Sequence, residues 1–158
     1  MLWQLGVLDG LATTTNVLQH ARFVGSSSGA LAVALAVCNV PSSHALDRAV
    51  ALAHVHGLFG RRRGLAGSAP LLRQWVTELI TPERVAQHGH RIHVLAAEFW
   101  SWKPCVLDSG GYPLLVDALM AAVHVPLFLS PKPAVRVGRQ GLYFDAHAAG
   151  RRAVERSA

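Results

Sequence analysis

The chain has 158 residues, of which 51% are hydrophobic and only 15% are charged. This composition excludes an intrinsically disordered chain, and the length suits one domain with a sizeable core. The net charge of +6 would favour contact with an anionic surface. The basic residues form only short clusters without interleaved aromatic residues, so we expect no nucleic-acid partner.

Helices and strands are predicted to alternate along the chain. Apolar residues at positions 1, 2, 5, 8 and 11 predict an N-terminal helix, and a short strand over 21–24 follows it. Further helices are predicted over 28–37, 41–56, 69–80, 82–87 and 112–124. Further strands are predicted over 91–100, 103–108, 135–137 and 142–145, with an extended segment at 127–130. This alternation predicts a layered α/β domain over 1–150 and a short basic tail over 151–158.

The cysteines and the apolar runs of the sequence indicate where in the cell the protein is found. Cys38 and Cys105 lie in different kinds of segment, and we expect both to be reduced, buried and structural. No signal peptide is visible, and the longest apolar run, Ala30–Val37, is too short to cross a bilayer. We therefore expect an intracellular protein that is cytoplasmic or peripheral on a membrane.

The residues Gly25, Ser26, Ser27, Ser28 and Gly29 form a G-x-S-x-G pentapeptide. A predicted strand precedes it and a predicted apolar helix follows it, which is the context of a nucleophile elbow with Ser27 as the nucleophile. We expect the turn to be too tight for a side chain at either glycine and to raise the Ser27 hydroxyl above the sheet. The positive N-terminal end of the following helix would help to stabilise an oxyanion there.

A serine nucleophile needs a base, and the sequence leaves two arrangements open. In a Ser-His-Asp triad the base would be His124 or His147, and the acid would be Asp108, Asp117 or Asp145. In a Ser-Asp dyad no histidine takes part.

The nine histidines do not indicate a metal site. His54 and His56 are two residues apart and would face different sides of a helix. His88, His90 and His93 straddle a predicted helix end, and no cysteine or carboxylate nearby completes a tetrahedral set. We expect neither a metal nor another cofactor.

Four stretches occur in a distinctive order along the chain. They are Trp3-Gln4-Leu5-Gly6-Val7-Leu8, residues 24–31 around the pentapeptide, residues 118–122 with Val125-Pro126-Leu127-Phe128, and Gly141-Leu142-Tyr143-Phe144-Asp145. The set resembles the patatin-like phospholipase (PNPLA) family, nearest to the animal-type branch that contains adipose triglyceride lipase and adiponutrin. In that family these stretches are the first helix, the nucleophile elbow, the helix and proline turn before the base, and the strand that delivers the catalytic aspartate.

The resemblance implies a layered fold with a central, mainly parallel sheet flanked by helices. It also implies that Ser27 is the nucleophile and Asp145 the base of a dyad. The implied activity is a lipid acyl hydrolase of the phospholipase or triacylglycerol lipase type, which cleaves glycerolipid or phospholipid esters. Peripheral contact with a membrane or lipid-droplet surface is implied as well.

The sequence departs from the pattern of the family at two places. The Asp-Gly motif of the family reads Asp145-Ala146-His147 here, and the added Cβ is expected to shift the aspartate. The sequence begins at Met1 within the stretch that resembles the first helix, so we expect this chain to lack the first strand and the Gly-rich oxyanion loop. Because one oxyanion donor is worth about 10²–10³ in rate, a non-catalytic relative that binds lipid or protein stays open as an alternative. A His-dependent serine esterase, built on the triad described above, is the second alternative.

Overall fold

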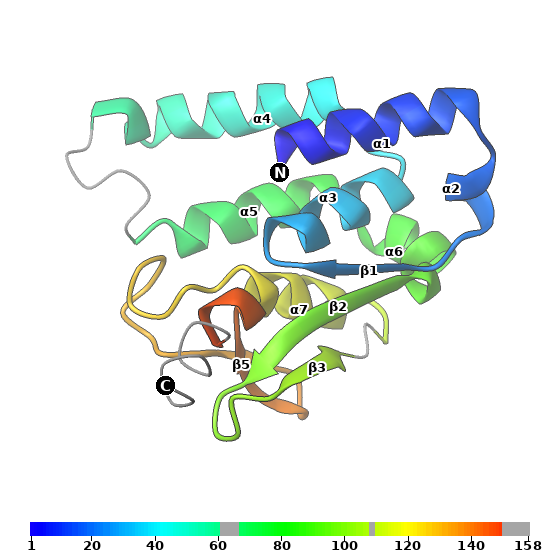
Figure 1. The fold of residues 1–158 in the computed structure, drawn as a ribbon. Helices are drawn as coiled ribbons and strands as arrows, with labels where there is room; N and C mark the ends of the chain where they lie inside the picture. The colour runs from blue at the N-terminus through cyan, green and yellow to red at the C-terminus, as the bar shows by residue number, and fades with distance from the viewer. Residues whose placement is uncertain (61–66, 108–109, 150–158) are drawn as a thin grey trace, which may run out of the picture.

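The computed structural model describes residues 1–60, 67–107 and 110–149 of the chain (Figure 1). The helices are α1 (Leu2–Thr14), α2 (Val17–His20), α3 (Ser28–Val37), α4 (Ser42–Val55), α5 (Ala69–Leu79), α6 (Pro82–His88) and α7 (Leu114–Ala122), with short 3-10 turns η1 (Leu58–Gly60) and η2 (Gly89–Arg91). The strands are β1 (Phe23–Ser26), β2 (Ile92–Glu98), β3 (Pro104–Leu107), β4 (Val135–Val137) and β5 (Gly141–Phe144). The fold is therefore mixed α/β, as predicted, and the predicted tail over 151–158 lies outside the described residues.

The described strands form one mixed sheet. β1 pairs with β2 in parallel, whereas the pairs β2–β3, β2–β5 and β4–β5 are antiparallel. The expectation of a mainly parallel sheet is therefore wrong. Short turns follow β2 and β4, and a connection that short can join only antiparallel neighbours.

Strands β1 and β5 share one edge of β2. Leu95 pairs with both β1 and β3, so these two strands lie on opposite edges of β2. Ala97 pairs with both β3 and β5, which places β5 on the edge opposite β3 as well. It follows that β1 and β5 lie one after the other along the same edge.

The C-terminal ends of β1 and β5 point toward each other along that edge. Ser26, at the end of β1, pairs with Leu95, and Phe144, at the end of β5, pairs with Ala97. Because β1 runs parallel and β5 antiparallel to β2, the two strands approach the same point from opposite directions. The next residues of both strands, Ser27 and Asp145, therefore meet.

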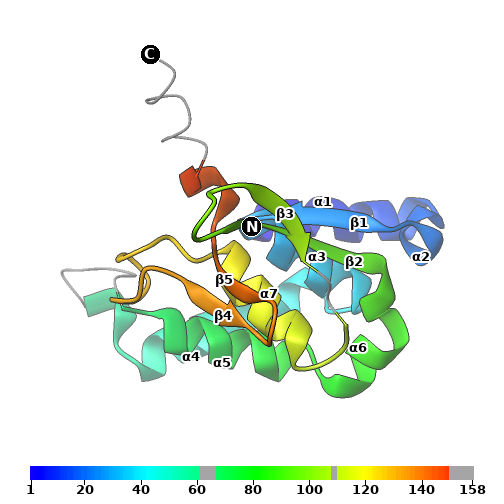
Figure 2. The same ribbon diagram turned by 90° about the horizontal axis from the view of Figure 1, so that it is seen from below.

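The helices gather on one face of the sheet. α3 and α7 pack against the strands, and α1 and α5 pack in turn on these two helices (Figure 1). α3 and α7 are apolar on nearly every side, as a helix enclosed between two layers must be. In the view from below, β1 and β3 lie in front of the helices (Figure 2), and the outward side chains of Val24 and Val106 are exposed.

The segment 127–130 does not have the extended structure that the sequence predicts. Leu127 has a φ of +64°, and the Leu129 N–H donates to the Val125 carbonyl at 3.5 Å, so the chain turns back on itself. The Leu129 carbonyl then accepts the Ala69 N–H at 3.1 Å. A tertiary contact with the start of α5 therefore holds this turn, and no local pattern indicates it.

Both cysteines are free thiols. Cys38 is buried at the end of α3, as predicted, and this burial raises the pKa of its thiol to about 11. Cys105 on β3 is only half-buried, in contrast to the prediction: it packs against the core, but β3 pairs only with β2 and so lies at the edge of the described sheet.

No helix in the described parts of the chain combines the length and the hydropathy that a membrane span requires.

Candidate active site

Ser27 lies at the sharp turn between β1 and α3. Its backbone has a φ of +51° and a ψ of −136°, a conformation that residues other than glycine rarely adopt. Such outliers cost about 1–3 kcal/mol and concentrate at active sites. The strand–turn–helix arrangement expected around the G-x-S-x-G pentapeptide is thus present, with a strained serine at its centre.

The two glycines of the pentapeptide differ in what surrounds them. A Cβ at Gly25 would lie 2.5 Å from the Cα and 2.8 Å from the N of Ala30, because α3 passes directly over the end of β1. A Cβ at Gly29 would meet only the Gln4 Nε2 atom, at 4.0 Å. The expectation that neither position has room for a side chain is therefore wrong for Gly29.

Ser27 and Asp145 contact each other directly. The Ser27 hydroxyl donates a hydrogen bond to Asp145 Oδ2 at 2.6 Å, a short bond within the normal range for two oxygen atoms. Asp145 is only 4% exposed. Its own N–H donates to the His124 carbonyl at 3.0 Å, so the backbone of the aspartate is also held in place.

The second oxygen of Asp145 caps a helical turn that covers residues 146–149. Asp145 Oδ1 accepts the His147 N–H at 2.9 Å, and the Asp145 carbonyl accepts the Ala148 N–H at 3.0 Å. The sequence analysis missed this contribution of the His147 backbone, although an Asp two residues before an N–H is a known capping pattern. Ala146 has no positive φ, and Asp145 contacts Ser27 with an alanine after it.

Neither histidine of the alternative triad lies between the serine and the aspartate. The His124 ring is 2% exposed, and its Nε2 bonds the Lys132 carbonyl at 2.9 Å. The His147 ring is 78% exposed, with Nδ1 at 3.6 Å from Asp145 Oδ1, which is the oxygen that Ser27 does not contact. The direct contact between Ser27 and Asp145 occupies the place that a bridging imidazole would need.

The other candidate acid that the structure describes, Asp117, does not join the site. Asp117 forms an ion pair with Arg73 between α7 and α5. Asp108 lies outside the described residues. Of the two candidate carboxylates that the structure describes, Asp117 and Asp145, only Asp145 is brought to Ser27.

The N-terminus of α3 supplies a donor for an oxyanion. The first N–H groups of a helix have no acceptor within it, and Ser28 is the first residue of α3. The residue after the nucleophile is the usual oxyanion donor at an elbow of this kind. Gln4 of α1, which the sequence analysis did not assign to the site, lies beside this donor and accepts the Ser28 hydroxyl at 3.4 Å.

No three histidine, cysteine or acidic side chains within the described ranges gather so that they could hold a metal ion.

Comparison of the chain with models of protein families, with curated proteins and with solved structures gives no match. The class of this protein is therefore described from its fold and site alone. It is a mixed α/β protein with a serine–aspartate pair at a turn between a strand and a helix.

Proposed function

We propose that this chain is a serine ester hydrolase of the patatin-like type that cleaves acyl esters of glycerolipids or phospholipids. The observation that carries the proposal is the 2.6 Å hydrogen bond from Ser27 Oγ to Asp145 Oδ2, which joins the two side chains directly at a strained elbow. The choice of glycerolipid or phospholipid esters as the substrate is supported by the four stretches that resemble the patatin-like family.

The reaction follows from the position of the two side chains. Asp145 accepts the hydroxyl proton as Ser27 Oγ attacks the ester carbonyl, and the Ser28 N–H stabilises the oxyanion that forms. The proton then passes to the alcohol oxygen as its bond to the acyl carbon breaks, which leaves an acyl-serine. Asp145 next deprotonates a water molecule that attacks the acyl carbon, and the carboxylic acid leaves as Ser27 recovers its proton.

A fluorophosphonate probe tests the nucleophile directly. The wild-type chain should be labelled at Ser27, as located by peptide mass spectrometry, and Ser27→Ala should lose the label. Ser26→Ala is the matched control, since the Ser26 hydroxyl is buried without a hydrogen-bond partner among the described residues, and it should keep the label. An unlabelled wild-type chain, or undiminished labelling of Ser27→Ala, would refute the proposal.

We also propose that the substrate is reached at a membrane or lipid-droplet surface, through the turn after β2. Trp100 in this turn is 76% exposed. Trp102 packs edge-on against Phe144 with ring centroids 4.8 Å apart. The turn after β2 therefore contacts Phe144, the residue before Asp145. Exposed tryptophans of this kind favour the interface between water and lipid.

Co-sedimentation with anionic lipid vesicles measures that contact. Trp100→Ser should bind several-fold less than the wild type, because the indole supplies most of the apolar area of the turn. Trp3→Ser removes an equally exposed tryptophan from α1 and should bind as the wild type does. Equal losses in both variants would show that the turn has no special part in the contact.

A further inference from the structure

We infer that an apolar pocket beside the start of α1 binds one aliphatic chain of roughly ten carbons, and that this chain is the acyl group of the ester that Ser27 attacks. The inference rests on the proposed function and adds to it the chain length of the substrate and the place where that chain lies.

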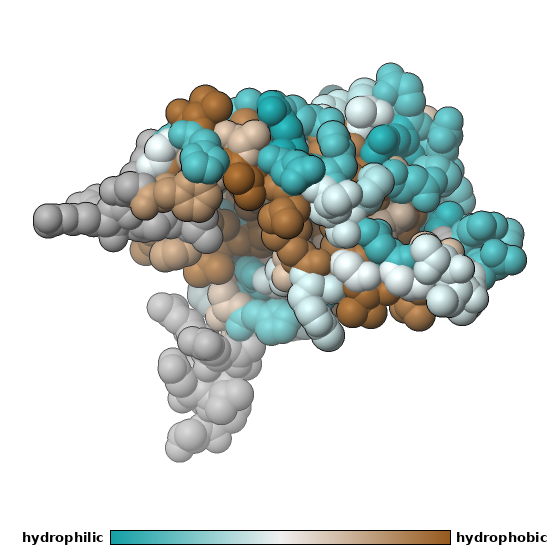
Figure 3. Space-filling model, turned by 90° about the horizontal axis from the view of Figure 1, so that it is seen from above, coloured by the Kyte–Doolittle hydropathy of each residue, from teal (hydrophilic) through white to brown (hydrophobic). Residues whose placement is uncertain are grey.

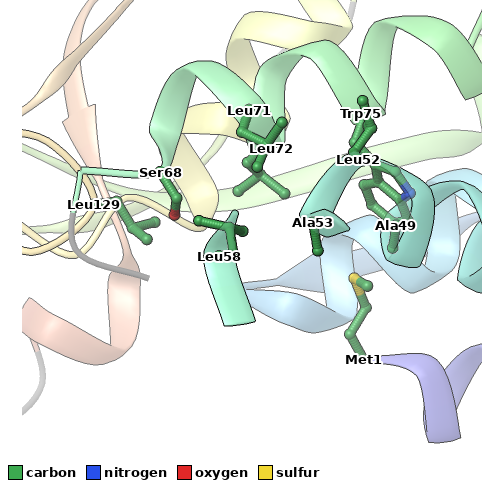
Figure 4. A pocket seen from close by; sticks show the side chains of 10 residues that line it. All are labelled: Met1, Ala49, Leu52, Ala53, Leu58, Ser68, Leu71, Leu72, Trp75 and Leu129. Carbon is green, nitrogen blue, oxygen red and sulfur yellow. The ribbon is translucent and has the colours of Figure 1, made fainter. Parts of the chain in front are cut away.

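The pocket has a volume of about 280 Å³ and lies between α1, α4, α5 and the segment after α7. Figure 4 shows that the side chains of Met1, which caps the start of α1, of Ala53 in α4 and of Leu72 in α5 surround the same space. Of its ten lining residues, only Ser68 has a polar side chain apart from the indole nitrogen of Trp75. That nitrogen already donates to the Ala45 carbonyl at 3.0 Å.

This lining determines what can bind. A charged or strongly polar group would lose its hydration in the pocket without gaining enough hydrogen bonds in return. A hydrocarbon chain gains by leaving water, and each methylene adds to that gain. A dry apolar cavity of about 150 Å³ accommodates benzene. A volume of about 280 Å³ therefore suits a single chain of roughly ten carbons.

The pocket lies close to the elbow. Met1 forms one of its walls, and the Leu5 N–H donates to the Met1 carbonyl at 3.0 Å across the first turn of α1. In the same turn, Gln4 contacts Ser28 at 3.4 Å. The pocket wall is thus about one helical turn, or ~5.4 Å along the axis, from the residue that touches the elbow. Figure 1 likewise places the start of α1 beside the start of α3.

The surface around the pocket is suited to the entry of a chain. Figure 3 looks onto the side of α1 and α4 and shows apolar side chains gathered around a hollow on this face. Val55 and Phe59, which flank the lining residue Leu58 along the chain, are both strongly exposed. Apolar side chains are therefore exposed next to the pocket, where an aliphatic chain can contact them.

Binding of decanoate to the wild-type chain and to Ser27→Ala tests the pocket separately from the chemistry. Ala53 lines the pocket and is half-buried, so Ala53→Phe should fill it and weaken binding at least tenfold, as measured by isothermal titration calorimetry. Ala51→Phe is the matched control, because Ala51 is exposed on the same helix and does not line the pocket. Circular dichroism checks the fold, and Ala49→Leu serves as a milder filling variant if Ala53→Phe does not fold.

Hydrolysis of nitrophenyl esters tests the connection to Ser27. The wild type should prefer the decanoate to the butyrate ester, and Ala53→Phe should reduce that preference at least tenfold while it keeps butyrate hydrolysis. Equal decanoate binding by the wild type, Ala53→Phe and Ala51→Phe, or an unchanged ester preference, would overturn the inference.

The two proposals fail in different ways. Decanoate binding that depends on Ala53 in a chain that a fluorophosphonate does not label would support the pocket and refute the hydrolase. It would favour a non-catalytic lipid-binding protein. Labelling at Ser27 in a chain that does not bind decanoate would support the hydrolase and overturn the pocket.

Discussion

Asp145→Asn is expected to reduce ester hydrolysis by about 10³-fold, since general-base catalysis is worth about 10²–10⁴ in rate. The amide has nearly the same shape as the carboxylate and can still accept the Ser27 hydroxyl, but it cannot take the proton when Ser27 attacks. The contact between these side chains is direct, at 2.6 Å, so among the described residues Asp145 is the one placed to take this proton. Initial rates with a soluble ester, together with the rate of fluorophosphonate labelling, measure the effect.

His147→Ala is the control that separates the dyad from the triad. This change removes an imidazole that is 78% exposed and keeps the backbone N–H that bonds Asp145 Oδ1. We therefore expect at most a few-fold change in rate, as for a surface substitution that leaves the site oriented. A loss in His147→Ala as large as that in Asp145→Asn would instead indicate a histidine-dependent esterase.

Gly25→Ala is expected to lower the free energy of unfolding by about 3 kcal/mol or more, because overpacking a rigid site costs 1–3 kcal/mol and occasionally more. The new methyl group would lie 2.5 Å from the Ala30 Cα, and the only relief is a shift of α3 away from β1. For a chain of this size, such a loss corresponds to a fall in Tm of roughly 10 °C. Thermal and urea unfolding followed by circular dichroism measure it.

Gly29→Ala is the matched substitution in the same pentapeptide. Gly29 lies in the first turn of α3 with open space where a Cβ would stand, so an alanine should be tolerated. We expect stability to be unchanged or to rise by about 0.5–1 kcal/mol, the usual effect of replacing a glycine within a helix. Similar losses in both variants would show that the turn, rather than the crossing of α3 over β1, excludes side chains.

Most of the local structure follows from the sequence. The apolar periodicity and the turn residues predict the order of the helices and strands, and the elbow follows from two glycines, a serine and their flanks. These features depend on backbone preferences and on neighbours within a few positions along the chain. The mainly parallel sheet was implied by the resemblance and is wrong: short turns join β2 to β3 and β4 to β5, and the β2–β5 pairing joins segments that are distant in sequence.

The choice of base depends on tertiary structure. Ser27 and Asp145 are 118 positions apart, and the sequence by itself leaves a dyad and a triad equally possible. Only the register of β1 and β5 along the same edge of β2 brings the two strand ends together. The same holds for the apolar pocket, whose walls come from the start of α1, from α4 and α5, and from the segments around Leu58 and Leu129. Hydrophobic pattern and turn chemistry are local properties, whereas register and the meeting of distant side chains arise only when the whole core packs.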